Sequence, residues 1–338
     1  MRASGAPRRV LITGGTGFVG SELARELDRR GHDVHVFARG SSERALLDDA
    51  QITWHEGDLC DAAAVERAVA RVSAGEAEPW IVHSGAVISY RTRDAELQRA
   101  VNIGGTRNVV EACRRQRVGR LLHISSVVAV GHSPDALPRD EQLDYNGAGL
   151  GCDYMDTKRA AEELVLGAAR DLDLVVVNPG AIFGPGHSGP NTVQFVRSVA
   201  RGRTGPFAPP GTLSVVGRGD VVSGCLLALE RGEPGRRYLL CESVWSFLDL
   251  FRLTARELGV RSPRWRLAPR PWRWLRAAAS VPDRFLDLSP ATPQALGMLG
   301  VHFSFDARRA REELGWRPRP FEGVLRETIA WLRESSLL

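Results

Sequence analysis

Near its amino end the chain reads Arg9-Val10-Leu11-Ile12-Thr13-Gly14-Gly15-Thr16-Gly17-Phe18-Val19-Gly20. An apolar strand pattern runs directly into glycines spaced Gly14-x-x-Gly17-x-x-Gly20, and a helical pattern follows them. Such glycines let the backbone turn tightly and approach a pyrophosphate at the N-terminus of a helix. Turns and helix caps also use glycine, so the triplet alone is weak evidence. Its place between a strand and a helix predicts a dinucleotide-binding site.

Strand and helix patterns alternate through the first half of the chain. Further strands are expected at 34–37, 52–55, 80–83, 120–125 and 174–177, and helices at 62–72, 96–115 and 154–170. Strands separated by helices predict an α/β fold, a doubly wound parallel sheet of the Rossmann type with ligands at the carboxyl ends of the strands. Residues 1–178 would form the nucleotide-binding domain. Residues 179–338 would form a smaller C-terminal substrate-binding lobe, partly threaded back onto the first domain, with loops at 187–190 and 202–211.

The expected strand ends carry small or polar residues. An acid after the third strand can accept a hydrogen bond from an adenine amino group, and small residues after the fourth let a cofactor lie flat on the sheet edge. His83 is interpreted as a packed residue at a strand end. Five residues at these ends are expected cofactor contacts: Asp58, Leu59, Ser84, Gly85 and Ala86.

The end of the second strand bears on the choice of cofactor. A site for an unphosphorylated ribose places a carboxylate there, but this chain has Ala38-Arg39-Gly40-Ser41-Ser42. No acid at this point repels a 2′-phosphate, and Arg39 with Ser41 can bind one. The sequence therefore favours NADPH (NADP) over NAD.

One lysine stands out among 45 Lys and Arg residues: Lys158 is the only lysine in the chain, and it follows Tyr154 by four residues. Residues four apart share one face of a helix. A nearby ammonium lowers the pKa of a phenol from about 10 by favouring the phenolate. A solvated Tyr and Lys on a helix surface would be the alternative reading of the pair alone.

Several segments in the same order resemble the extended short-chain dehydrogenase/reductases, the NAD-dependent epimerase/dehydratase family, and within them the dihydroflavonol 4-reductase-like subgroup. The resemblance covers nearly the whole chain. It rests on the segments 13–20, 57–59, 101–108, 124–126, 154–158, 178–180, 184–185 and 313–316.

The resemblance implies a set of catalytic residues. Ser126, with Gly131 five residues later, would hydrogen-bond the substrate oxygen, and Tyr154 would exchange the proton. Lys158 would hold the nicotinamide ribose and lower the pKa of Tyr154, and Asn102 would support a proton relay. The remaining expected cofactor contacts are Gly14, Thr16, Gly17, Phe18, Val19, Gly20, Lys158 and Pro179.

Departures from the family pattern favour a reductase. Epimerases of the family usually have an acid at the position of Ala38, and dehydratases an acidic pair where Val127 and Val128 follow Ser126. Asn178 does not discriminate, since epimerases use an asparagine there on the diphosphate. We expect hydride transfer to a ketone or enone of a fairly apolar small molecule of secondary metabolism. The alternatives are a sugar or sugar-nucleotide epimerase with retained NAD(P), and a non-catalytic NADP-binding sensor.

Composition sets outer bounds on partners and compartment. The 338 residues are 43% hydrophobic and 25% charged, with a net charge of +5 spread along the chain, so nucleic-acid binding is not expected. Residues 1–7 lack a signal-peptide pattern and no apolar run is long enough to span a bilayer, so a cytoplasmic protein without stable membrane insertion is expected. Five scattered cysteines argue against disulfides and a metal site. The family resemblance implies a homodimer that pairs through the helices at 96–115 and 154–170.

One stretch, residues 264–276, interleaves tryptophan with arginine. It reads as a membrane-surface or nucleic-acid contact, or as an amphipathic helix that covers an apolar cleft with its arginines in water, and the cover is the favoured interpretation. Aromatic residues that can line an apolar pocket, or belong to the core, are Phe183, Phe195, Phe207, Trp272 and Trp274.

Overall fold

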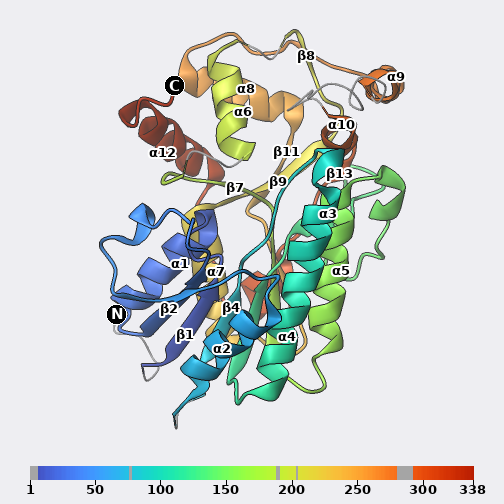
Figure 1. Cartoon of the computed structure of the whole chain (residues 1–338). Coiled ribbons are helices and arrows are strands. Elements are labelled where there is room, and N and C mark those ends of the chain that lie inside the picture. Colours follow the sequence, from blue (N-terminus) through green and yellow to red (C-terminus); the bar gives the residue numbers. More distant parts are fainter. Residues whose placement is uncertain (1–6, 76–77, 188–190, 203–204, 280–291) are drawn as a thin grey trace.

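A seven-stranded parallel sheet forms the centre of the computed structural model, which describes residues 7–75, 78–187, 191–202, 205–279 and 292–338 (Figure 1). The strand order is β10-β6-β5-β4-β1-β2-β3, and every neighbouring pair is parallel. This confirms the predicted doubly wound sheet. The strands are β1 (Arg9–Thr13), β2 (Asp33–Ala38), β3 (Ile52–Glu56), β4 (Trp80–His83), β5 (Arg120–Ile124), β6 (Leu174–Pro179) and β10 (Arg237–Leu240).

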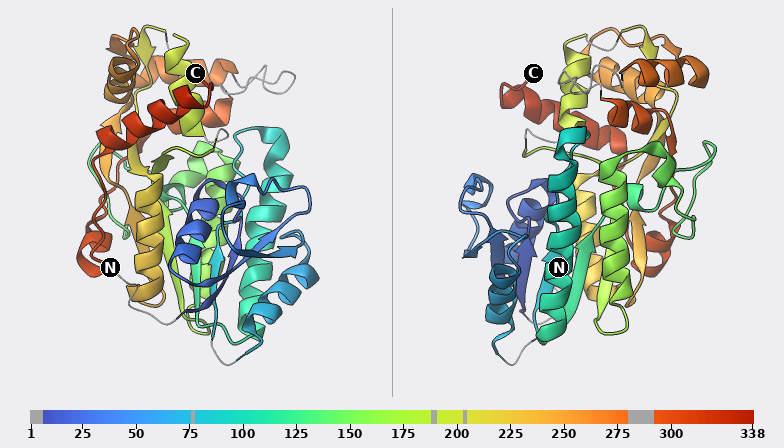
Figure 2. Two further views of the ribbon diagram at one scale, coloured as in Figure 1. Left: turned by 90° about the vertical axis from the view of Figure 1, so that its left-hand side faces the viewer. Right: turned by 45° about the vertical axis from the view of Figure 1, so that its right-hand side comes forward.

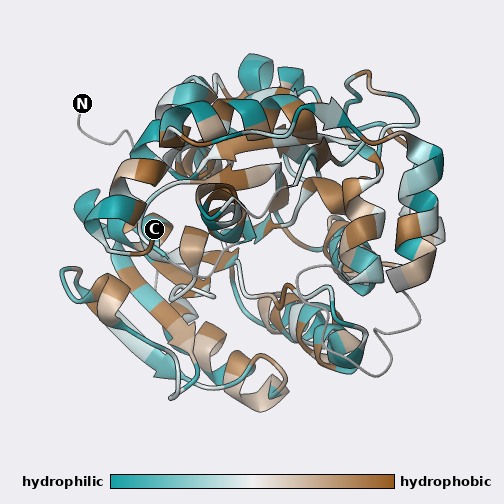
Figure 3. Cartoon of the chain, turned by 90° about the horizontal axis from the view of Figure 1, so that it is seen from above, coloured by the Kyte–Doolittle hydropathy of each residue, from teal (hydrophilic) through white to brown (hydrophobic). Residues whose placement is uncertain are grey.

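Helices cover both faces of this sheet, as the two views of Figure 2 show. Because side chains alternate along a strand, Val10 and Ile12 of β1 pack on one face, while Leu11 packs on the other. The first face is covered by α1 (Phe18–Arg29) and α7 (Arg218–Arg231), and the second by α2 (Ala62–Ser73), α4 (Thr106–Arg115) and α5 (Asp153–Gly167). In Figure 3 single helices carry both hydrophobic and hydrophilic residues, as expected for helices with one buried face.

The helix expected at 96–115 is continuous, but it is not α-helical throughout. It consists of α3 (Ala95–Gln98), a π-helix (Arg99–Gly105) and α4. Gly105 lies so close to Leu59 that an added Cβ would stand 2.9 Å from the Leu59 Cβ. π turns inside α-helices are frequent at functional sites, and this one holds Asn102 in its middle.

The second half of the chain contributes to both lobes. Strand β10 completes the first sheet, and helix α7 packs on it. Trp316 also returns to this lobe, where its Nε1 donates to the carbonyl of Asp220 in α7 at 2.8 Å. The second lobe lies at the carboxyl end of the main strands (Figure 1). Its small sheet contains β7 (Ala181–Phe183), β9 (Thr212–Gly217), β11 (Ser243–Ser246) and β13 (His302–Phe303).

Helices and a short ribbon complete this second lobe. Its core packs Phe183, Val196, Leu250 and Phe321 together. Residues 188–190 and 203–204 of the two predicted loops lie outside the described residues. Its other helices and strands are α6 (Asn191–Ala200), β8 (Phe207–Ala208), α8 (Phe247–Leu258), β12 (Trp265–Arg266), α9 (Pro269–Ala279), α10 (Pro293–Leu299) and α12 (Phe321–Glu334). Helix α11 (Arg308–Glu313) packs on β10 of the main sheet.

Candidate active site

Ser126, Tyr154 and Lys158 meet at the carboxyl end of β5. Ser126 begins the loop after β5 with extended backbone, and Tyr154 and Lys158 lie one turn apart at the start of α5. The Ser126 and Tyr154 side chains are hydrogen-bonded to each other. Lys158 Nζ donates to the Ile124 carbonyl at 3.0 Å. The structure thus brings together three residues that the sequence separates by up to 32 positions.

Burial governs the charges of this group. Tyr154 is 8% exposed, and desolvation raises its pKa to about 12, partly offset by the hydrogen bond with Ser126. The expectation that Lys158 lowers this pKa is wrong for the protein chain alone, because desolvation dominates and the ammonium is directed to a main-chain carbonyl. Burial lowers the pKa of Lys158 to about 8, against the opposing charge of Glu162. At neutral pH the phenol is therefore protonated and the amine still mostly charged.

Two asparagines expected near the site are fixed by internal contacts. Asn102 Nδ2 donates to the Val87 carbonyl at 3.0 Å and to Thr157 Oγ1 at 3.1 Å, and its Oδ1 accepts from the Val87 amide at 2.7 Å. Asn102 therefore joins the loop after β4 to the face of α5 next to Lys158.

Asn178, at the end of β6, is fully buried. Its Nδ2 donates to Glu162 Oε2 at 2.6 Å and to the Ser126 carbonyl at 3.0 Å. Asn178 therefore holds the loop that contains Ser126, and its amide hydrogens point into the protein and away from solvent. The neighbouring Pro179 is also buried and ends the strand.

The glycine loop has the close approaches that its spacing predicts. Gly14 has φ +68°, and an added Cβ would stand 2.7 Å from the backbone of Gly85. An added Cβ on Gly20 would stand 2.2 Å from the Gly14 carbonyl oxygen. Thr16, Phe18 and Val19 complete this turn and the start of α1, together with Gly17, whose amide donates to the Gly14 carbonyl at 3.0 Å.

The start of α1 fits a diphosphate group. Its N-cap is Gly17, and no side chain caps the helix. The first amides of a helix lack intrahelical acceptors, so an uncapped N-terminus beside a glycine-rich loop is suited to an anion. Arg218 holds this turn from behind: it donates to the Phe18 carbonyl at 2.6 Å and to Ser21 Oγ at 2.9 Å, and its guanidinium lies 4.9 Å from the Phe18 ring centroid. The sequence gives no sign of this role for Arg218, because Arg218 lies 200 residues from Phe18.

His83 links the strand ends through a buried chain of hydrogen bonds. Thr106 Oγ1 donates to the Asn102 carbonyl, so it accepts from His83 Nε2 at 2.9 Å. The other ring nitrogen, Nδ1, must then accept from Thr13 Oγ1 at 2.7 Å, and Thr13 Oγ1 accepts from the Gly85 amide at 3.3 Å. Burial lowers the pKa of His83 to about 3, so the ring is neutral. This confines His83 to positioning the loop after β4.

The other predicted cofactor contacts lie on the same edge. Asp58 Oδ1 accepts from the Cys60 amide at 2.8 Å, and the Leu59 side chain contacts the backbone position of Gly85. Ser84 continues the sheet, donating from its amide to the Thr13 carbonyl at 3.1 Å. Together with Ala86 these residues follow the carboxyl ends of β3 and β4.

A cation and an acid lie where β2 and β3 end side by side. Arg39 is exposed and makes no side-chain hydrogen bond or ion pair within the described residues, and Ser41 is exposed beside it. Glu56, at the end of the adjacent β3, was missed because the parallel register pairs it with Ala38 across 18 residues. An added Cβ on Gly40 would stand 2.6 Å from Glu56 Oε1. Arg44 lies 3.8 Å from Glu56 Oε2 and stacks on Trp54.

The aromatic residues singled out in the sequence do not form one pocket. Phe183 and Phe195 pack edge to face in the second lobe, and Trp272 is buried against α10. Phe207 and Trp274 are 49% and 78% exposed. Tyr90, which was not singled out, is the ring that meets Tyr154, edge to face at 6.0 Å between centroids.

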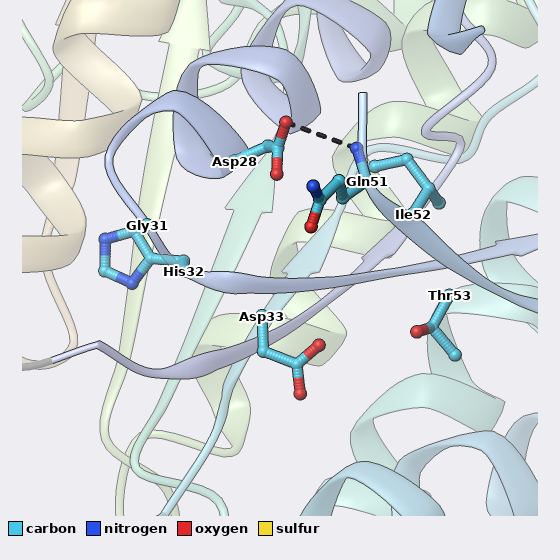
Figure 4. A pocket seen from close by; sticks show the side chains of 7 residues that line it. All are labelled: Asp28, Gly31, His32, Asp33, Gln51, Ile52 and Thr53. Carbon is cyan, nitrogen blue, oxygen red and sulfur yellow. Dashed lines mark hydrogen bonds between the residues drawn. The ribbon is translucent and has the colours of Figure 1, made fainter. Parts of the chain in front are cut away.

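A separate pocket of about 460 Å³ lies at the opposite, amino edge of β2 and β3 (Figure 4). Its only drawn hydrogen bond runs from the Gln51 amide to Asp28 Oδ2 at 3.2 Å. Ligands of doubly wound sheets bind at the carboxyl edge, so this pocket is not part of the site. Its lining is Asp28, Gly31, His32, Asp33, Gln51, Ile52 and Thr53. Within the described residues no group of three or more His, Cys, Asp or Glu side chains could hold a metal ion, and no helix has the length and apolarity to cross a bilayer.

Comparisons with known proteins agree with this geometry. Residues 10–241 match the model of the NAD dependent epimerase/dehydratase family. The chain is similar to the sterol demethylase protein B of Methylococcus capsulatus, with 31% identity over 97% of this chain and 99% of that protein. It is also similar to a putative dihydroflavonol 4-reductase of Synechocystis, with 28% identity over 96% of this chain and 94% of that protein.

Among solved structures, the chain resembles a nucleoside-diphosphate-sugar epimerase from Pseudomonas aeruginosa. The TM-score is 0.78 and the identity 27%, covering 98% of this chain and 99% of that one. A family model that matches most of the chain and a full-length relative above 30% identity together decide its membership. The chain belongs to the NAD dependent epimerase/dehydratase family of extended short-chain dehydrogenase/reductases, and it is an NAD(P)-dependent oxidoreductase.

Proposed function

We propose that the protein is an NADPH-dependent reductase that reduces the carbonyl group of a fairly apolar small molecule, a ketone or enone. The observation that carries this proposal is the junction of Ser126, Tyr154 and Lys158 beside the glycine loop, with the serine and phenol hydroxyls hydrogen-bonded to each other. Two adjacent hydroxyl groups can both donate hydrogen bonds to one substrate oxygen. A reduced nicotinamide cofactor, with its diphosphate at the uncapped start of α1, would supply the hydride.

The roles of the three residues follow from their environments. With its pKa raised to about 12, Tyr154 keeps its proton at neutral pH and can give it to an oxygen on which negative charge develops. Ser126 donates a second hydrogen bond to that oxygen. Lys158 uses one of its three donor hydrogens on Ile124, which leaves two for a ribose.

The preference for NADPH rests on Arg39 and on Ala38. Arg39 is exposed without a partner among the described residues, at the place where a 2′-phosphate would lie, and Ala38 offers no carboxylate to a ribose hydroxyl. Glu56 acts in the opposite direction, but Arg44 lies close enough to balance part of its charge. The proposed net effect is a preference for NADPH over NADH that is weaker than in a site without an acid.

Steady-state oxidation of NADPH and NADH with a panel of apolar ketones, enones and sterol-like ketones tests this function. We expect consumption of NADPH with at least one ketone, and formation of the alcohol in equal amount. An absence of net cofactor oxidation across the panel, with conversion of a sugar nucleotide to its epimer, would contradict it.

The epimerase alternative draws support from the fold shared with the sugar-nucleotide epimerase. Asn178 weighs against it. A residue that binds a diphosphate needs free amide hydrogens, but both contacts of Asn178 Nδ2 are inside the protein, to Glu162 and Ser126. Because Asn178 is fully buried, engaging a diphosphate would require breaking these contacts.

A further inference from the structure

One surface remains outside the site described above. Strands β8 and β12 form a two-residue ribbon in which the rings of Phe207 and Trp265 lie 5.7 Å apart and are both about half exposed. Helix α9 follows two residues later, and both lie at the far end of the second lobe (Figure 1). We define residues 207, 261–266 and 270–275 as the Trp/Arg surface.

Helix α9 has two distinct faces. Trp272 is buried and donates from Nε1 to the Leu296 carbonyl at 2.8 Å, and Arg276, one turn later, donates to the Leu150 carbonyl. On the opposite face lie Arg270, Arg273 and Trp274, at i, i+3 and i+4. Trp274, at 78%, is the most exposed of the large hydrophobic residues described. The interpretation of this stretch as a cover over an apolar cleft therefore accounts for Trp272 alone.

The charge of this surface is uniform. Residues 259–279 contain six arginines and no Asp or Glu. Several exposed arginines elsewhere pair with acids, as in Arg114–Asp171 and Arg319–Glu327. Five of the six, Arg261, Arg264, Arg266, Arg270 and Arg273, form no side-chain ion pair with any acid among the described residues. Exposed aromatic rings among unpaired arginines are the combination that interfacial helices present to anionic lipid headgroups.

The Trp/Arg surface is connected to the catalytic helix. Helix α10, on which Trp272 packs, holds the first residue of α5: Gln294 Nε2 donates to Asp153 Oδ2 at 2.7 Å, and Gln294 Oε1 accepts from the Asp153 amide at 3.1 Å. Asp153 directly precedes Tyr154. A membrane bound at α9 would therefore lie on the part of the second lobe that covers the start of α5.

We propose that the Trp/Arg surface docks the protein peripherally on an anionic lipid bilayer. The arginines contact the headgroups, and Trp265, Trp274 and Phe207 enter the interface, without any segment crossing the bilayer. The proposal is independent of the reaction that the active site performs. We favour a lipid surface over a DNA duplex, because clustered aromatic rings partition into a lipid headgroup region but gain little free energy at the phosphate backbone of a duplex.

Co-sedimentation of the full chain with vesicles tests the docking. Binding is expected to vesicles of phosphatidylglycerol mixed with phosphatidylcholine, to be weak with phosphatidylcholine alone, and to fall at high salt. Each arginine near an anionic surface contributes about fivefold to the partition coefficient, so Arg270→Gln with Arg273→Gln should weaken binding about 25-fold. Trp265→Ala with Trp274→Ala should weaken it at least about tenfold.

A matched control removes the same charge at the other end of the molecule. Arg29 and Arg117 have side chains 64% and 87% exposed and lie at the amino edge of the main sheet, so Arg29→Gln with Arg117→Gln should bind vesicles within about threefold of the parent protein. Thermal unfolding checks that all variants fold. Equal losses in the two arginine pairs, equal binding to both lipid mixtures, or binding to a DNA duplex with none to vesicles would each overturn the proposal.

Discussion

Replacing Tyr154 by Phe isolates the proton-donating hydroxyl. The ring keeps its edge contact with Tyr90, at 6.0 Å between centroids, so packing is conserved. The structure loses one hydrogen bond with Ser126, which costs about 1 kcal/mol of unfolding free energy, or about 2 °C in the melting temperature at this chain length. Loss of a general acid costs about 10²- to 10⁴-fold in kcat, equivalent to about 3–5 kcal/mol in the activation free energy. The expected change in the activation free energy is thus larger than the expected change in the free energy of unfolding.

The assay is the stopped-flow decrease of NADPH absorbance with a ketone substrate, beside a fluorescence titration of NADPH binding. We expect Tyr154→Phe to lose at least about 100-fold in kcat with the NADPH dissociation constant within about threefold of the parent. Tyr90→Phe is the control, because it removes the hydroxyl of the facing ring, bonded to Asn191, and should leave kcat nearly unchanged. A Tyr154→Phe enzyme that retains most of its kcat, or two variants that lose activity equally, would refute the assigned role.

Three further predictions concern the cofactor site and pH. Arg39→Ala should weaken the binding of NADPH about tenfold and that of NADH little, whereas Glu56→Gln should tighten the binding of NADPH about threefold relative to that of NADH. Isothermal titration with both cofactors measures these affinities. Equal losses of affinity for both cofactors in Arg39→Ala would contradict the prediction. Lys158 has a pKa of about 8 in the folded chain, so it is charged below and neutral above that pH, and kcat/KM for NADPH should fall as pH rises through about 8; a profile that stays flat to well above this value would contradict the assignment. Gly20→Ala should destabilise the fold by about 1–3 kcal/mol in chemical denaturation, because its methyl group meets a carbonyl oxygen at 2.2 Å, whereas Gly323→Ala, in a helix with open space around it, should be neutral or stabilising.

The strands could be predicted from the sequence because local patterns determine them. β4 has the predicted limits, and β6 extends only two residues beyond its predicted end. The shared face of Tyr154 and Lys158 likewise follows from helix geometry alone. What local patterns could not show is the π turn at Arg99–Gly105, where the chain fits against Leu59 from another element.

The missed parts of the site depend on tertiary structure. Glu56 comes next to Ala38 only through the parallel register of β2 and β3. His83 is held by Thr13 and Thr106, which are 70 and 23 residues away. The pKa of Tyr154 rises because the folded protein removes water from the phenol, and a sequence shows the neighbouring charge but not the burial.

The most direct test of the proposed reaction uses NADPH deuterated at the transferred position of the nicotinamide, in a single turnover with a ketone. Hydride transfer with Tyr154 as proton donor predicts an alcohol that carries the deuterium on its carbinol carbon, with one NADP formed for each alcohol and with solvent supplying only the exchangeable hydroxyl proton. Formation of product with all of the deuterium still on the cofactor would contradict it.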